Sequence, residues 1–135
     1  MEKIYLTLFS LLRQALGVEK ENDLSALNEE EWSCVYQQAW KQSVCGIAYE
    51  AVKQLSGKHC PPDDLLFMWT AEAERIKGMN CLLFEEATRM TRLFAHEGHH
   101  TVVLKGQANA ILYPNPFSRQ CGDIDLWVDG GHDTG

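Results

Sequence analysis

The chain has 135 residues, 45% of them hydrophobic, and a formal net charge of −7 at pH 7. This length and composition suit one soluble globular domain with a core of its own, and the acidic balance gives no direct nucleic-acid signal. No stretch has the length of a membrane span, and the five cysteines include no C-x-x-C pair. We therefore expect a cytoplasmic protein that has no contact with a membrane and no disulfide framework or zinc site.

The N-terminal part of the chain has the spacing of amphipathic helices. Apolar residues recur at helical intervals from Ile4 to Leu16, with polar residues between them, so this segment predicts a helix and not a signal peptide. Asn28 is a good N-cap, because three glutamates follow it where the helix dipole favours negative charge. A third helix is expected from Val44 to Leu55, ended by Ser56-Gly57. The second helix carries an apolar stripe made of Trp32, Val35, Tyr36, Ala39 and Trp40.

A long helix is predicted from Pro61-Pro62 to about Ala95, because its apolar residues keep helical spacing throughout. Gly78 and Asn80 mark a place where this helix could bend or break. We interpret the methionines of this stretch and all the tryptophans of the chain as core residues. The tryptophans are Trp32, Trp40, Trp69 and Trp127.

The hydrophobic period changes at Gly98. Thr101 to Leu104 is a short β-branched run between glycines, which is typical of a buried strand. Gln107 to Tyr113 can form two helical turns, stopped by the Pro114-Asn115-Pro116 turn. Ile124 to Val128 predicts a second strand. The expected domain organisation is a helical region over residues 1–97, followed by strand, short helix, loop and strand over residues 98–135.

Two acids, Asp123 and Asp125, stand at alternate positions in the second predicted strand. Alternate positions share one face of a strand, with Cα atoms about 7 Å apart. Two carboxylates on one face of an otherwise apolar strand are costly unless solvent or a cation neutralises them. Mg²⁺ prefers oxygen ligands, and paired metal ions stabilise the attacking and leaving oxygens of phosphoryl transfer. The pair therefore predicts a Mg²⁺ or Mn²⁺ site, with a solvated strand edge as the alternative.

Three motifs occur in order around these acids: Leu104-Lys105-Gly106, then Tyr113-Pro114-Asn115-Pro116, then Arg119-Gln120-Cys121-Gly122-Asp123-Ile124-Asp125-Leu126. Together they resemble the polymerase-β-like nucleotidyltransferase superfamily, in particular an uncharacterised bacterial nucleotidyltransferase family within it. The resemblance implies an α+β fold, in which a helical N-terminal region packs on the opening strand-helix-strand of the catalytic core. It also implies two-metal transfer of a nucleoside monophosphate from a nucleoside triphosphate to an unknown acceptor.

The resemblance also assigns roles to single residues. Asp123 and Asp125 would be the catalytic metal ligands. The backbone around Gly106 and Gln107 would approach the phosphates of the nucleotide. Lys105 would neutralise charge on the nucleotide, and the alternative is that it is a solvated lysine at the end of the strand. The residues that would contact the nucleotide are Lys105, Gly106, Gln107 and Arg119. Arg119 could equally be a structural clamp on the first acid or on a loop carbonyl.

The chain departs from the superfamily pattern in ways that affect these expectations. Gln107 stands where the superfamily usually has serine or glycine. The third carboxylate of the superfamily lies on a later strand, and Asp129 and Asp133 follow Asp125 too closely to replace it. The sequence therefore predicts an N-terminal fragment that is inactive by itself, with an uncovered strand edge that favours a homodimer. The alternative is a non-catalytic helical interaction module with a remnant nucleotidyltransferase motif.

A competing motif precedes the first predicted strand. His96-Glu97-Gly98-His99-His100 satisfies H-E-x-x-H, in which two histidines on one helix face bind zinc. That geometry needs an unbroken helix, whereas Gly98 lies inside the motif and a strand is expected from Thr101. We therefore interpret the motif as a polar helix-to-strand connection.

Overall fold

The structure, a computed structural model, describes residues 2–18, 26–104, 113–120 and 125–129. Within these residues all helices end by His96 and both strands follow Gly98, as the sequence predicts. The elements in chain order are α1 (Glu2–Ala15), α2 (Glu29–Lys41), α3 (Cys45–Val52), the 3₁₀ helix η1 (Gly57–His59), α4 (Asp63–His96), β1 (Thr101–Leu104) and β2 (Asp125–Val128). No described helix is both long and apolar enough to cross a membrane.

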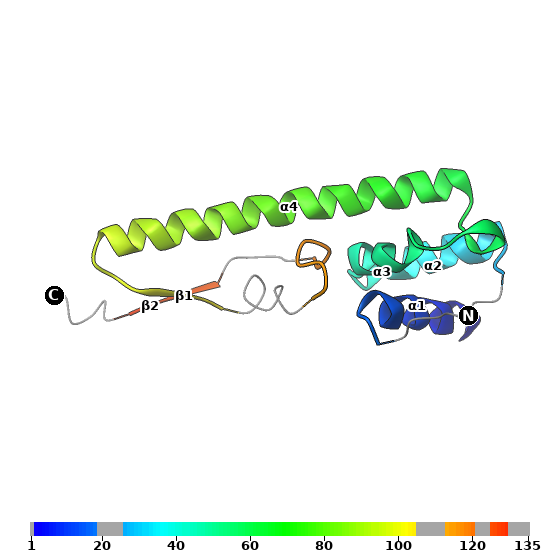
Figure 1. Cartoon of the computed structure of the whole chain (residues 1–135), viewed down its shortest axis with the longest axis horizontal. Coiled ribbons are helices and arrows are strands. Elements are labelled where there is room, and N and C mark those ends of the chain that lie inside the picture. The colour runs from blue at the N-terminus through cyan, green and yellow to red at the C-terminus, as the bar shows by residue number, and fades with distance from the viewer. Residues whose placement is uncertain (1, 19–25, 105–112, 121–124, 130–135) are drawn as a thin grey trace.

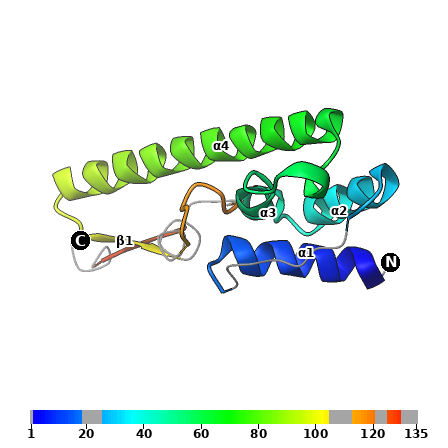
Figure 2. The ribbon, with the colours of Figure 1, turned by 45° about the vertical axis from the view of Figure 1, so that its right-hand side comes forward.

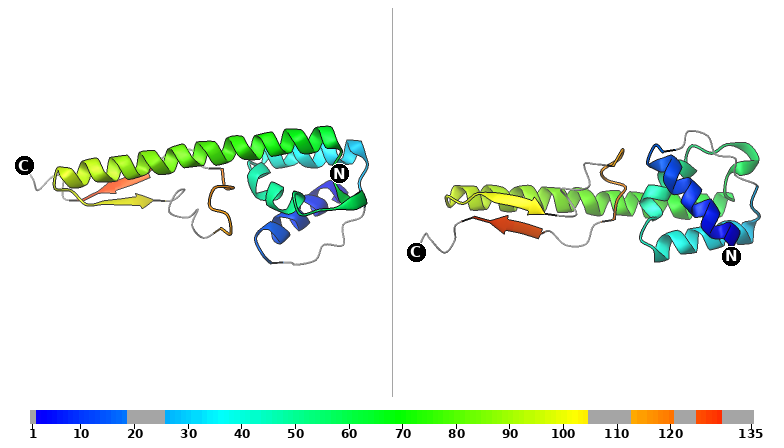
Figure 3. Two further views of the ribbon diagram at one scale, coloured as in Figure 1. Left: turned by 45° about the horizontal axis from the view of Figure 1, so that its top comes forward. Right: turned by 90° about the horizontal axis from the view of Figure 1, so that it is seen from below.

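The molecule is elongated, and α4 runs along its length (Figure 1). Helices α1, α2 and α3 gather at the N-terminal half of α4, while β1 and β2 lie along its C-terminal half (Figures 1 and 2). The two strands lie side by side and run in opposite directions (Figure 3). The loop of residues 113–120 lies between the helical cluster and the sheet, so it is in position to contact both α3 and α4.

The helical end has a continuous apolar core built around Trp69, which is fully buried. The indole N–H of Trp69 donates to the Cys45 carbonyl at 3.0 Å, and its ring makes edge contacts with Trp32 and Tyr36. Burial, then the nearby Glu72 carboxylate, raises the pKa of the Cys45 thiol to about 12, so this thiol stays protonated at neutral pH. The buried members of the predicted stripes include Ile4, Leu8, Leu11, Trp32, Val35, Ala39, Leu65 and Ile76.

The predicted N-cap of α2 is confirmed. The Asn28 side chain accepts from the Glu31 N–H at 2.8 Å, and the Glu31 carboxylate accepts from the Asn28 N–H at 3.0 Å, which forms a capping box. Lys3 of α1 pairs with Glu31 at 2.9 Å. The Asn28 N–H, then the Lys3 ammonium, lowers the pKa of Glu31. The start of α2 is thus joined to α1 by a polar contact at the surface.

Some sequence predictions about the helices are wrong in detail. Helix α3 ends at Val52 and not at Leu55, because the chain tightens there into turns in which Leu55 N–H donates to the Val52 carbonyl at 3.1 Å. Gly78 and Asn80 do not interrupt α4. Two of the tryptophans and two of the methionines assigned to the core are exposed, because the described neighbouring elements do not cover the faces of the helices and of β2 on which they lie. These residues are Trp40, Trp127, Met68 and Met79.

The sheet is an antiparallel pair in which Thr101 is opposite Val128 and Leu104 is opposite Asp125. β1 has the predicted bounds, and β2 starts at Asp125, because Ile124 lies outside the described residues. The turn at Pro114–Pro116 is confirmed by bends and turns at these positions. Most of the predicted short helix, residues 107–112, lies outside the described residues.

Candidate active site

The two strands place Leu104, which comes directly before the predicted nucleotide-binding residues in sequence, beside Asp125, one of the two predicted metal ligands. Asp125, the first residue of β2, is the backbone partner of Leu104, the last residue of β1. Leu104 is the first residue of the Leu-Lys-Gly motif, so the start of this motif lies beside β2 at one end of the sheet. The other site residues predicted on these two segments, Lys105, Gly106, Gln107 and Asp123, lie outside the described residues.

Arg119 belongs to the loop of residues 113–120 that leads toward the acids. Its guanidinium carbon lies 6.0 Å from the centre of the Tyr113 ring, which is within the range of a cation–π contact. Its backbone carbonyl accepts a hydrogen bond from the Asn80 side chain. The backbone of Arg119 is therefore bonded to α4, and its guanidinium group lies beside the ring of Tyr113.

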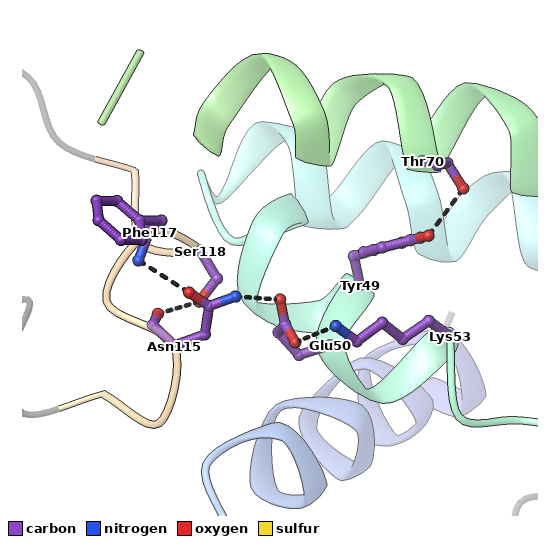
Figure 4. A network of polar contacts seen from close by, with 7 residues as sticks. All are labelled: Tyr49, Glu50, Lys53, Thr70, Asn115, Phe117 and Ser118. Atoms are coloured by element: carbon purple, nitrogen blue, oxygen red, sulfur yellow. Dashed lines mark hydrogen bonds and ion pairs between the residues drawn. The ribbon is translucent and has the colours of Figure 1, made fainter. Parts of the chain in front are cut away.

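The same loop is docked on α3 through Asn115. The Asn115 amide donates to a Glu50 carboxylate oxygen at 2.7 Å, and the other Glu50 oxygen pairs with Lys53 at 2.7 Å (Figure 4). The Asn115 side-chain oxygen accepts from the Phe117 N–H, and its backbone carbonyl accepts from the Ser118 hydroxyl (Figure 4). Asn115 thus closes the turn and also attaches it to a helix.

Three helix residues that the sequence analysis missed complete the docking of this loop. Asn80 of α4 donates to two loop carbonyls. Gly46 of α3 lies so close to the loop that a Cβ there would be 2.2 Å from the Ser118 carbonyl oxygen. Phe84 of α4 packs edge-on against Phe117, with ring centres 5.4 Å apart. A polar residue in an apolar stripe and a glycine inside a short helix were the sequence signals that could have indicated Asn80 and Gly46.

The H-E-x-x-H motif does not form a zinc site on a helix. Helix α4 ends at His96, and Gly98 adopts a positive φ of +86° that ends the helical path. His96 and His100 therefore do not share one helix face, as predicted. Across the ranges that the structure describes, no group of three or more His, Cys, Asp and Glu side chains is placed to hold a metal ion.

Asp129, which the sequence analysis considered and rejected as a third carboxylate, has a structural role in the sheet. Its carboxylate accepts from the His100 N–H at 2.9 Å, and its own N–H donates to the His100 carbonyl at 3.0 Å. These bonds extend the β1–β2 ladder by one residue beyond Val128. Asp125 lies at the opposite end of β2. The Asp129 carboxylate is therefore engaged in a hydrogen bond at the other end of the strand from the predicted metal ligand Asp125.

Most of the chain matches a known protein family. Residues 28–132 match the family described as "Uncharacterised nucleotidyltransferase". The match begins at the N-cap of α2 and extends past β2, so it includes α2, α3 and α4 as well as both strands, while α1 lies before it. Comparison with curated proteins and with solved structures gives no match. Since more than half of its residues match, the chain, mostly helical with a small antiparallel sheet, belongs to this uncharacterised nucleotidyltransferase family.

Proposed function

We propose that Asp123 and Asp125 hold a Mg²⁺ or Mn²⁺ ion in a nucleotidyltransferase active site. The reaction is transfer of a nucleoside monophosphate from a nucleoside triphosphate to an acceptor, in which the bond between the α- and β-phosphates breaks and pyrophosphate leaves. Family membership supports the use of a nucleoside triphosphate. The observation that carries the site is the pairing of Leu104 with Asp125, which puts the start of the Leu-Lys-Gly motif beside the acid-bearing strand.

The residues of the chain have distinct roles in this proposal. A bound divalent cation would neutralise phosphate charge and stabilise the charge that develops during transfer. Asp123 and Asp125 bind the cation, because hard divalent cations prefer carboxylate oxygens. The backbone around Gly106 and Gln107 approaches the phosphates, and Lys105 adds positive charge. Arg119 adds a second positive charge, and its fixed backbone and its contact with Tyr113 support this role.

The fold proposal follows from the same segments. Residues 98–135 form the opening part of a polymerase-β-like catalytic core, and residues 1–97 form a helical region packed on it. The docking of the loop of residues 113–120 on α3 and α4 supports this arrangement, since it joins the helices to the segment that contains the site. The helical region thus acts as the support of the catalytic segment.

One observation favours the alternative, a non-catalytic interaction module. Val102 and Trp127 are direct cross-strand partners, and about half of each side chain is exposed. Contiguous exposed apolar surface marks sites that contact another molecule, and this pair is the apolar surface that the described part of the sheet offers for such a contact. A module of this kind would contact a partner through the sheet and would need no cation at the acids. Cation binding therefore distinguishes the nucleotidyltransferase from the interaction module.

Titration with Mn²⁺ tests the proposed function. We expect paramagnetic broadening of backbone amide signals centred on Asp125 and Leu126, because the ion is bound there. In Asp125→Asn this broadening should disappear, since an amide is a weaker ligand than a carboxylate. Asp64→Ala is the matched control, because it removes an exposed carboxylate at the far end of α4. Broadening centred on His96 and His100, or broadening that persists in Asp125→Asn, contradicts the proposal.

A further inference from the structure

Asn80 is a buried polar side chain in the middle of α4. Only 1% of its surface is exposed, and a buried amide is costly unless its hydrogen bonds are made. Its side-chain nitrogen donates to the Phe117 carbonyl at 2.7 Å and to the Arg119 carbonyl at 2.5 Å. Both amide protons are thus used on backbone atoms more than 35 residues away in sequence. The Asn80 side chain therefore stabilises the position of the loop, although Asn80 itself belongs to α4.

The loop is held between α4 and α3 at this point. Ser118, which lies between the two bonded carbonyls, is 7% exposed, and its own carbonyl faces Gly46 of α3. On the α4 side the Phe117 ring contacts the Phe84 ring. Three successive residues of the loop, 117 to 119, are therefore fixed by contacts with two helices.

The fixed residues come directly before the acids in sequence. Arg119 is followed by Asp123 and Asp125, and Asp125 is itself fixed by its pairing with Leu104 in the sheet. The described residues on either side of residues 121–124 are therefore both fixed, Arg119 by Asn80 and Asp125 by the sheet. We propose that Asn80 is a positioning residue, which sets the placement of the carboxylates that bind the cation; this inference rests on the proposed function.

The expected effect follows from how supporting contacts act on metal sites. Residues that orient ligands without touching the ion change metal affinity by about 10–100-fold when they are replaced. Without the Asn80 amide, the Phe117 and Arg119 carbonyls lose this donor and the loop is no longer fixed to α4. The loop that comes before the acids in sequence is then no longer fixed, so we expect Mn²⁺ affinity to fall.

The experiment measures Mn²⁺ affinity of the full chain in Asn80→Leu and in Asn80→Ser, at temperatures where circular dichroism shows each to be folded. Leucine removes both donors and keeps a side chain branched at the same carbon, and serine supplies a single, shorter donor. We expect a loss of about 10–100-fold for leucine and a smaller loss for serine. If leucine impairs folding, Gly78→Ala in the same chain restores stability, because Gly78 is an exposed helical position with open space around it.

Thr70→Ala is the matched control on the same helix. It removes a part-buried hydroxyl that bonds Tyr49 at 3.0 Å and touches no residue of the loop (Figure 4). Lower stability with unchanged Mn²⁺ affinity in Thr70→Ala, together with weaker affinity in folded Asn80 variants, supports the inference. Folded Asn80 variants that bind Mn²⁺ as tightly as the wild type overturn it and leave the proposed function standing. Wild-type binding that Asp125→Asn does not alter overturns both.

Discussion

Replacing Trp69 with alanine is expected to lower the free energy of unfolding by about 3–5 kcal/mol, the usual cost of truncating a buried tryptophan. Trp69 is fully buried, contacts the Trp32 and Tyr36 rings, and donates to the Cys45 carbonyl. Its side chain therefore joins α4 to α2 and α3 at the centre of the core. Urea denaturation followed by circular dichroism measures the change.

Two tryptophan substitutions serve as controls for this effect. Trp69→Phe keeps an aromatic ring but loses the N–H, so we expect a smaller loss than for alanine. Trp40→Ala changes a side chain that is 59% exposed on α2, and surface changes of this kind usually stay within about 0.5 kcal/mol. Equal losses at Trp69 and Trp40 would mean that the core is not organised around Trp69.

Replacing Gly46 with alanine is expected to destabilise the fold by about 1–3 kcal/mol, the range for an overpacked interior. A Cβ at this position would lie 2.2 Å from the Ser118 carbonyl oxygen and 3.4 Å from a methyl carbon of Ile76. Since α3 is packed in the core, the loop has to move instead, and its bonds to Asn80 break. Thermal unfolding gives the loss of stability, and the Asn80 side-chain amide signals report the movement of the loop.

Gly78→Ala is the opposite case and the control for Gly46. Gly78 also lies inside a helix, but no atom comes within 4 Å of a Cβ built on it. Alanine should therefore stabilise α4 by about 0.5–1 kcal/mol, because glycine is the poorer helix former. If Gly46→Ala is as well tolerated as Gly78→Ala, the loop is not seated against α3.

The helical part of the fold could be predicted from sequence because its signals are local. The apolar spacing of α1 and of α4 and the cap at Asn28 each act over a few residues. The width of a buried stripe depends on which neighbours cover it, and for this reason Trp40 was wrongly assigned to the core. The contacts of Asn80 and Gly46 join distant parts of the chain, and neither spacing nor composition specifies such partners.

For the candidate site, the sequence predicts where the strands lie in the chain but not how they pair. The position of β1 and the start of a strand near the acids followed from the β-branched runs and the glycines around them. The antiparallel pairing of Leu104 with Asp125 could not be predicted from these patterns, because the direction of pairing depends on the path of the chain between the strands. The roles of Lys105, Gly106, Gln107 and Asp123 stay predictions, since these residues lie outside the described ones.

Binding of a non-hydrolysable nucleoside triphosphate, measured by calorimetry with and without Mg²⁺, tests the central claim most directly. A nucleotidyltransferase site that uses Asp123 and Asp125 should bind the nucleotide in the presence of Mg²⁺, and the binding should be lost in the double variant Asp123→Asn, Asp125→Asn. A cation held by Asp123 and Asp125 would supply the positive charge that the phosphates need, so removing the cation or the two carboxylates should abolish nucleotide binding. Nucleotide binding that needs neither Mg²⁺ nor the two acids, or no nucleotide binding by the folded wild type, would contradict the account.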